Sequence, residues 1–99
     1  MSAYKVKAKV WIYPGGTARW HFVTIPKKES ALIKKKFGAN ARGWGSLPVT
    51  VTLGKTKWDT SIFPDRKSET YLLPLKAVVR RAEDVEEGEA ISFSLAIRT

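Results

Sequence analysis

Residue types that perform hydrolytic chemistry occur as one loose set in this 99-residue chain. Ser61 or Thr60 would supply a nucleophile, His21 a base and Asp59 an orienting acid, which are the three roles of a hydrolase triad. His21 is the only histidine, and no strained G-x-S-x-G turn surrounds Ser61. Ordinary outward-facing strand residues would produce the same pattern. The sequence therefore leaves enzyme activity undecided and favours a protein that is not an enzyme, with no catalytic residues.

Metal-binding and phosphate-binding motifs are poorly represented. The chain has no cysteine and one histidine, which is a poor set of zinc ligands. The acidic run at 83–87 (EDVEE) lacks the alternating oxygen ligands and central glycine of a calcium loop, and we expect a solvated turn there. The glycines at 15–16 and 43–45 are too sparse for a phosphate-binding loop. We predict no metal site and no cofactor.

A small anionic ligand is one candidate partner. Lys76 and Arg80 are four residues apart, so on a helix they would share a face and could hold a carboxylate or phosphate near the helix start. The alternative is structural: the neighbouring aromatic residues fill the core, and Arg80 pairs with Asp59 or Glu83. The structural alternative is favoured. The candidate ligand-binding residues are Trp58, Thr60, Tyr71, Lys76 and Arg80.

Nucleic acid is the other candidate partner, because the charge is large and uneven. The net charge is +9, from 18 basic and 9 acidic residues. Residues 1–40 hold nine basic residues and the single acid Glu29, which gives +8, whereas residues 41–99 hold nine basic and eight acidic residues, which gives +1. Such asymmetry is typical of sites for polyanions, but it also occurs as a simple solubility feature.

The basic excess includes one face of the first predicted strand. In the sequence YKVKAKVWIY at 4–13, alternate residues share a face. The lysines would contact phosphates, the aromatic residues would stack on bases, and the run Lys34-Lys35-Lys36 would add phosphate contacts. The alternative is that the aromatic residues pack under a helix and the lysines are solvated. The candidate nucleic-acid-binding residues are Lys5, Lys7, Lys9, Trp11 and Tyr13.

Periodicity and turn signals predict the elements that carry these residues. Alternation of apolar and polar residues predicts six strands, at 4–13, 19–25, 47–53, 55–63, 70–73 and 90–97. A turn at Pro14-Gly15-Gly16 joins the first two. Helices are predicted at 27–37, with Leu32, Ile33 and Phe37 on a buried stripe and Gly38 as the cap, and at 75–82. The pattern indicates a mainly β fold, a small six-stranded barrel with two short helices.

Size and composition bound the remaining properties. A chain of 99 residues is one domain by size, and we take 1–99 as a single barrel domain. The hydrophobic share of 43% is too high for a disordered chain. The first residues lack the apolar run of a signal peptide, and no window approaches 18 apolar residues. We therefore expect a soluble cytoplasmic protein with no membrane partner, either a monomer or a homodimer.

Four segments of the chain carry a resemblance to a known family. They read WDTSIFP at 58–64, YLLPLK at 71–76, VRRA at 79–82 and EGEAI at 87–91, and the looser match WHFVTIP lies at 20–26. In these segments the chain resembles the family catalogued as domain of unknown function nineteen-oh-five, although that family usually has Gly-Asp where this chain has Gly88-Glu89. The resemblance implies a compact barrel, similar to the double-split class that includes the swapped-hairpin transcription factors. It implies no assigned activity and an accessory or binding role.

Overall fold

The computed structural model describes residues 3–14 and 19–99. Six antiparallel strands close into a barrel in the order β1-β2-β5-β4-β3-β6, with β6 returning to pair with β1. This confirms the predicted mainly β barrel. Its elements are β1 (Ala3–Ile12), β2 (His21–Ile25), α1 (Lys27–Phe37), β3 (Leu47–Leu53), β4 (Thr56–Asp65), β5 (Thr70–Pro74), α2 (Ala77–Ala82) and β6 (Ala90–Ile97).

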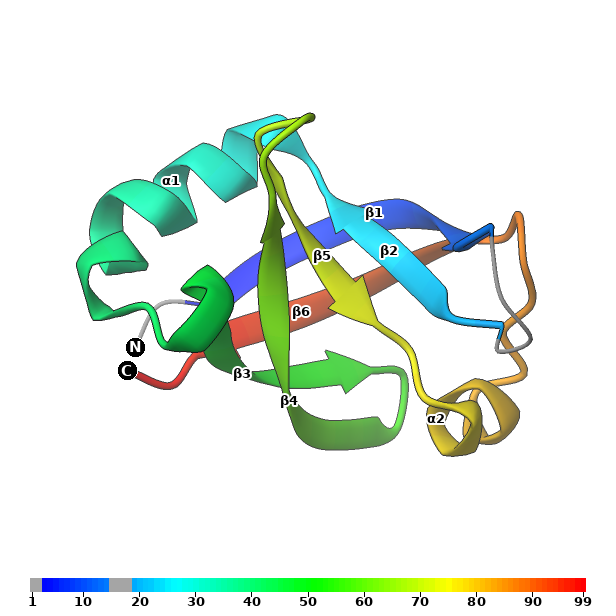
Figure 1. The fold of residues 1–99 in the computed structure, drawn as a ribbon. Coiled ribbons are helices and arrows are strands. Elements are labelled where there is room, and N and C mark those ends of the chain that lie inside the picture. Colours follow the sequence, from blue (N-terminus) through cyan, green and yellow to red (C-terminus); the bar gives the residue numbers. More distant parts are fainter. Residues whose placement is uncertain (1–2, 15–18) are drawn as a thin grey trace.

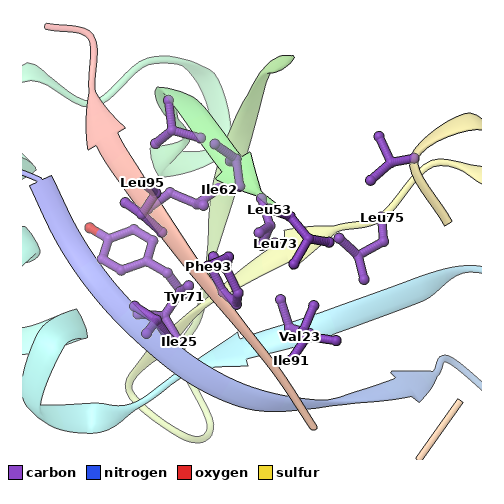
Figure 2. Close-up of a cluster of buried hydrophobic side chains, with 14 of the residues drawn as sticks. Val23, Ile25, Leu53, Ile62, Tyr71, Leu73, Leu75, Ile91, Phe93 and Leu95 are labelled. Atoms are coloured by element: carbon purple, nitrogen blue, oxygen red, sulfur yellow. The ribbon is translucent and has the colours of Figure 1, made fainter. Parts of the chain in front are cut away.

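Strand alternation divides the barrel into an apolar interior and an outer surface. Residues directly opposite each other on antiparallel strands share a face. Val10, Val23 and Leu73 form one such inward row across β1, β2 and β5, and Val51 joins Leu95 on β3 and β6. All five are buried. Figure 2 shows how the inward side chains of several strands meet in one cluster.

Helix α1 packs on the barrel through a narrow stripe. Ser30 and Ile33 are buried and Phe37 is half-buried, at the spacing of residues on one side of a helix. Leu32 is 50% exposed, so its predicted burial was wrong: it lies about 100° around the helix from Ile33. Gly38 adopts φ −56° and continues into a 3₁₀ turn (Gly38–Asn40), so it is not a left-handed cap.

Helix α2 and the β3–β4 hairpin lie together. The two-residue turn of this hairpin contains Gly54, at φ +59°. The hydroxyl of Thr56 donates a 2.6 Å hydrogen bond to Glu83, the residue that follows α2. The helix starts at Ala77 rather than at the predicted 75: Leu75 donates its backbone N–H to His21 of β2, and Lys76 provides the first helical acceptor, its carbonyl to the N–H of Arg80. Figure 1 shows α1 and α2 at opposite ends of the molecule.

The remaining boundaries differ from prediction by a few residues. β4 extends two residues further than predicted, to Asp65, and β2 begins at His21. A second 3₁₀ turn spans Gly43–Gly45. The predicted turn at Pro14-Gly15-Gly16 lies largely outside the described residues. Within the part of the chain that is described, no helix has the length and apolar character needed to cross a membrane.

The strands β4 and β5 pair over only a short stretch, and this feature positions the candidate site. β4 pairs with β3 from Thr56 to Ile62 but with β5 only through the pairs of Phe63, Pro64 and Asp65. Figure 1 shows the two strands diverging as they leave the turn that joins them. β4 continues beside β3, whereas β5 continues beside β2 toward α2.

Candidate binding groove

A groove of about 580 Å³ lies on the outer surface where β4 and β5 separate. Its size lies within the range of about 300–1,000 Å³ that is typical of ligand sites. Apolar side chains from three segments form most of its lining: Trp20 and Phe22, Phe63, and Leu72 with Pro74. The groove is therefore a mostly apolar hollow at the surface of the barrel.

The strand register explains why these apolar groups gather. Phe22 lies opposite Pro74 across β2 and β5, and Leu72 lies opposite Phe63 across β5 and β4. Each pair therefore projects from the same outer face of the sheet. Trp20 is 59% exposed and Phe63 is 40% exposed. Large aromatic side chains gathered and exposed on an outer face are characteristic of interaction sites.

A second aromatic residue supports Phe22 from the neighbouring strand. The ring centroids of Trp11 and Phe22 are 5.2 Å apart, with the ring planes tilted by 32°. The indole nitrogen of Trp11 donates a 2.9 Å hydrogen bond to the hydroxyl of Thr24 on β2. These contacts fix the orientation of Trp11, and Trp11 in turn limits the movement of the Phe22 ring that lines the groove.

Polar groups occupy the rim of the groove. Asp59 accepts a 2.6 Å hydrogen bond from the Thr50 hydroxyl, and its carboxylate lies 3.7 Å from Arg98 Nε. Lys76 is exposed, and no ion pair of its ammonium group is recorded among the described residues. The acid at the rim therefore already has partners, whereas Lys76 presents its charge to solvent. Ser61 also lines the groove from β4.

The residues predicted to bind an anionic ligand occupy different environments. Thr60 and Lys76 line the groove. Trp58 packs half-buried against the core, and its buried indole N–H has no hydrogen-bond partner within the described part of the chain. Tyr71 is a buried core residue, shown in Figure 2 among its apolar neighbours. Burial raises the pKa of its phenol above the ordinary value, because the charged form is poorly solvated there.

Arg80 does not join Lys76 in the groove. Its Nε donates to the backbone oxygen of Leu75 at 3.2 Å, and Nη1 lies 3.4 Å from Nε2 of His21. Arg80 therefore anchors α2 to the end of the barrel. The expected pairing of Arg80 with Asp59 or Glu83 was wrong, because those carboxylates contact Arg98 and Thr56 instead.

The triad candidates are not linked to one another. The recorded side-chain partners of His21 are the Arg19 carbonyl, 3.3 Å from Nδ1, and Arg80. The side-chain partners of Asp59 are Thr50 of β3 and Arg98, which follows β6. No hydrogen bond connects His21 with Ser61 or Asp59 among the described residues. Within residues 3–14 and 19–99, no three His, Asp or Glu side chains are grouped as metal ligands.

The predicted basic face belongs to β1, which is not a neighbour of β4 or β5 in the barrel. In the strand order, the β1–β6 pair lies across the barrel from the β4–β5 pair that borders the groove. Lys5, Lys7 and Lys9 are exposed, and Tyr13 is 54% exposed just after the strand ends. The cross-strand pairs place Lys5 beside Ser94 of β6, Ser94 beside Thr52 of β3, and Thr52 beside Lys57 of β4. A row of small hydroxyl side chains is thus flanked by a lysine at each end.

Several groove residues were missed in the sequence prediction. The signal for some of them was present, because alternation already placed Trp20 and Phe22 on one face of their strand and Phe63 opposite the inward set. Outward aromatic residues on several strands are unusual enough to suggest a surface site. The convergence of these residues with Leu72, Pro74 and Arg98 depends on strand pairing that no local pattern specifies.

The fold is a small closed antiparallel barrel, and a groove lined mainly by apolar side chains lies on its outer surface. The chain belongs to the family described as domain of unknown function (DUF1905), whose model matches residues 7–95. This confirms the predicted family, which has no assigned activity. No curated protein matches the chain.

Proposed function

We propose that the chain is a binding domain whose groove between β4 and β5 receives an anionic partner that carries an aromatic or other apolar group. The observation that carries this proposal is the clustering of Trp20, Phe22 and Phe63 around one hollow with Lys76 at its rim. Ligand sites combine such apolar linings with a few polar groups that orient the ligand. The aromatic rings would bury the apolar group, and Lys76 would contact the anion.

The proposed site needs groups from one chain only, so it functions in a monomer and is compatible with a homodimer. A chain without cysteine suits a reducing compartment, and we propose that the domain acts in the cytoplasm. The proposal includes no chemical step. Its Ser61 and Thr60 hydroxyls would serve as hydrogen-bond partners for the bound group, because among the described residues neither is hydrogen-bonded to a base and the neighbouring Asp59 carboxylate is engaged by Thr50 and Arg98.

The test is an NMR titration of the ¹⁵N-labelled protein with 1-naphthylacetate, an aromatic carboxylate, and with neutral 1-naphthylacetamide. We expect saturable shifts around Ser61, Phe63 and Lys76, with the carboxylate binding more tightly than the amide. Phe63→Ser should weaken binding about tenfold, whereas Leu32→Ser, at a similarly exposed position on α1, should leave it unchanged. Shifts scattered over the surface, or equal affinity in both variants, would contradict the proposal.

A second candidate function is supported by the lysine–hydroxyl row on β1, β6, β3 and β4. Lysines at both ends of a row of Ser94 and Thr52 would contact successive phosphates of a nucleic acid, with hydroxyl donors between them. Exposed Tyr13 would stack on a base, whereas the ring of Trp11 is engaged by Phe22. This candidate uses a surface that does not include the groove residues.

Fluorescence anisotropy with labelled single-stranded and double-stranded oligonucleotides tests this second candidate. With about four phosphate contacts, a fourfold increase in salt should weaken binding on the order of 10²-fold. Replacing Lys5 and Lys7 with Gln should reduce both the affinity and the salt dependence. The control replaces Lys27 and Lys28 of α1 with Gln, which lowers the net charge by the same amount and should have a smaller effect. Salt-independent binding, or no binding at low salt, would exclude it.

A further inference from the structure

Part of β4 that borders the groove, at Asp59–Ser61, pairs with β3 on one side but has no strand paired on the other, and this unpaired edge indicates the kind of partner. In an antiparallel ladder, successive residues direct their backbone N–H and C=O groups to opposite neighbouring strands. Pairing of β4 with β3 starts at a two-residue turn, so Thr56, Trp58 and Thr60 direct these groups to β3. Asp59 and Ser61 consequently direct theirs to the other side, toward the groove.

Pairing on β5 agrees with this assignment and shows why the ladder stops. Leu75 donates its N–H to His21 of β2, so odd-numbered β5 residues face β2 and even-numbered ones face β4. Continuing the register from the pair of Phe63 and Leu72 places Pro74 opposite Ser61. Proline has no N–H to donate, so one of the two hydrogen bonds of this pair cannot form, and the ladder with β4 ends one step earlier, at Phe63 and Leu72. The β4 edge at Asp59 and Ser61 remains without a neighbouring strand.

We propose that the groove binds an extended acidic peptide that adds a strand to β4 at Asp59–Ser61 and places an aromatic or large apolar side chain against Phe63 and Trp20. This inference rests on the proposed function and specifies its partner. Strand addition obtains affinity from backbone hydrogen bonds to a free edge and specificity from pockets for alternate side chains. Both features are present here, because the apolar lining adjoins the unpaired edge.

Charge defines the chemistry of the peptide. The chain carries +9, Lys76 at the rim lacks a recorded ion pair among the described residues, and Asp59 is engaged by Thr50 and Arg98. An acidic side chain of the peptide would therefore lie near Lys76. Charge repulsion disfavours a second copy of this chain as the occupant, because both copies are strongly basic. An acidic segment of another protein is electrostatically complementary to the groove.

The first experiment selects peptides from a displayed library of random octapeptides on the intact chain. We expect enriched sequences in which an aromatic residue lies near an acidic one. The affinity of a synthetic copy should fall at least tenfold in Phe63→Ser and should be unchanged in Leu32→Ser. A Lys76→Glu variant should prefer the same peptide with Lys replacing its acidic residue. Absence of enriched peptides, or binding that is indifferent to Phe63→Ser, would overturn the inference.

The second experiment separates strand addition from side-chain binding alone. N-methylation of alternate peptide bonds removes the donors that face β4 and retains every side chain. We expect at least tenfold weaker binding for the methylated peptide, and slower amide exchange at Asp59 and Ser61 only with the unmethylated one. Equal binding of both peptides would overturn strand addition and leave the proposed groove intact. If neither peptides nor naphthylacetate bind, the proposed function fails as well.

Sedimentation showing a dimer that Phe63→Ser dissociates would assign the groove to a second copy and overturn the inference.

Discussion

Pro74 lies at the position of β5 that faces Ser61 of β4 when the recorded pairing of the two strands is continued. A proline at this point weakens the ladder, since it cannot donate one of the two hydrogen bonds that the pair would exchange. The pairing of β4 and β5 stops one step earlier, at Phe63 and Leu72, and outward aromatic side chains line the groove at this point. The groove thus lies where Pro74 cannot supply a hydrogen bond to β4.

Replacing Pro74 with Ala supplies the missing donor, and we expect the ladder between β4 and β5 to lengthen. The amide at position 74 should then exchange slowly with solvent, and naphthylacetate should bind less well. The free energy of unfolding should change by no more than about 1 kcal/mol, because one new hydrogen bond offsets the greater freedom of the unfolded chain. Pro26→Ala, at the start of α1, serves as the control. Rapid exchange at position 74 would contradict this account of the opening.

Ser30 links α1 to two strands, and its replacement tests that link. Its hydroxyl donates to the Ile25 carbonyl at 2.9 Å and accepts from the Tyr71 N–H at 3.0 Å, all within the buried interior. Ser30→Ala leaves the Tyr71 N–H without this partner, and we expect a loss of about 1–3 kcal/mol in urea denaturation. Ser94→Ala, on the outer face of β6, should cost less than about 0.5 kcal/mol. Equal losses would show that the Ser30 bonds are unimportant.

Gly54 allows the β3–β4 turn to adopt φ +59°, and a Cβ there would collide with the carboxylate of Glu83. We expect Gly54→Ala to lower the free energy of unfolding by about 1–2 kcal/mol from backbone strain, and further by displacing Glu83 from Thr56. Gly88→Ala measures the backbone-strain contribution alone, since Gly88 has φ +85° and an added Cβ would meet nothing within 4 Å. Identical thermal shifts in both variants would argue against a contribution from Glu83.

Tyr71 should contribute to loss of stability at alkaline pH. Burial raises the pKa of its phenol above 10.0, so the folded state holds this proton more tightly than the unfolded state. The resulting stabilisation is complete below pH 10.0 and is lost as the pH rises through the folded-state pKa. Tyr71→Phe should therefore lose less stability than the parent between neutral pH and pH values above 10.0. A Tyr71→Phe curve parallel to that of the parent over this pH range would contradict this account.

Local patterns predicted most of the fold. Alternation along β1 and β6 identified the inward residues, and Pro26 with the four-residue spacing of Ile33 and Phe37 identified α1. The candidate site was harder to predict from the sequence, because it depends on contacts between segments that are distant in the chain. Lys76 and Arg80 have helical spacing, yet α2 begins after Lys76, and the guanidinium of Arg80 turns to His21. Which strands meet, and where one pairing ends, is decided by closure of the whole barrel.

The four tryptophans permit the most direct test of the central claim, because each has a different environment. Trp20 lines the groove, Trp11 is hydrogen-bonded to Thr24, Trp58 packs against the core, and Trp44 is 94% exposed in the Gly43–Gly45 turn. The protein would be labelled with 5-fluorotryptophan and titrated with naphthylacetate while its ¹⁹F spectrum is recorded. A large, saturable shift of the Trp20 resonance, with Trp44 unchanged, is the expected result. A shift of Trp44 alone, or no saturable shift of Trp20, would contradict the assignment of the groove as the binding site.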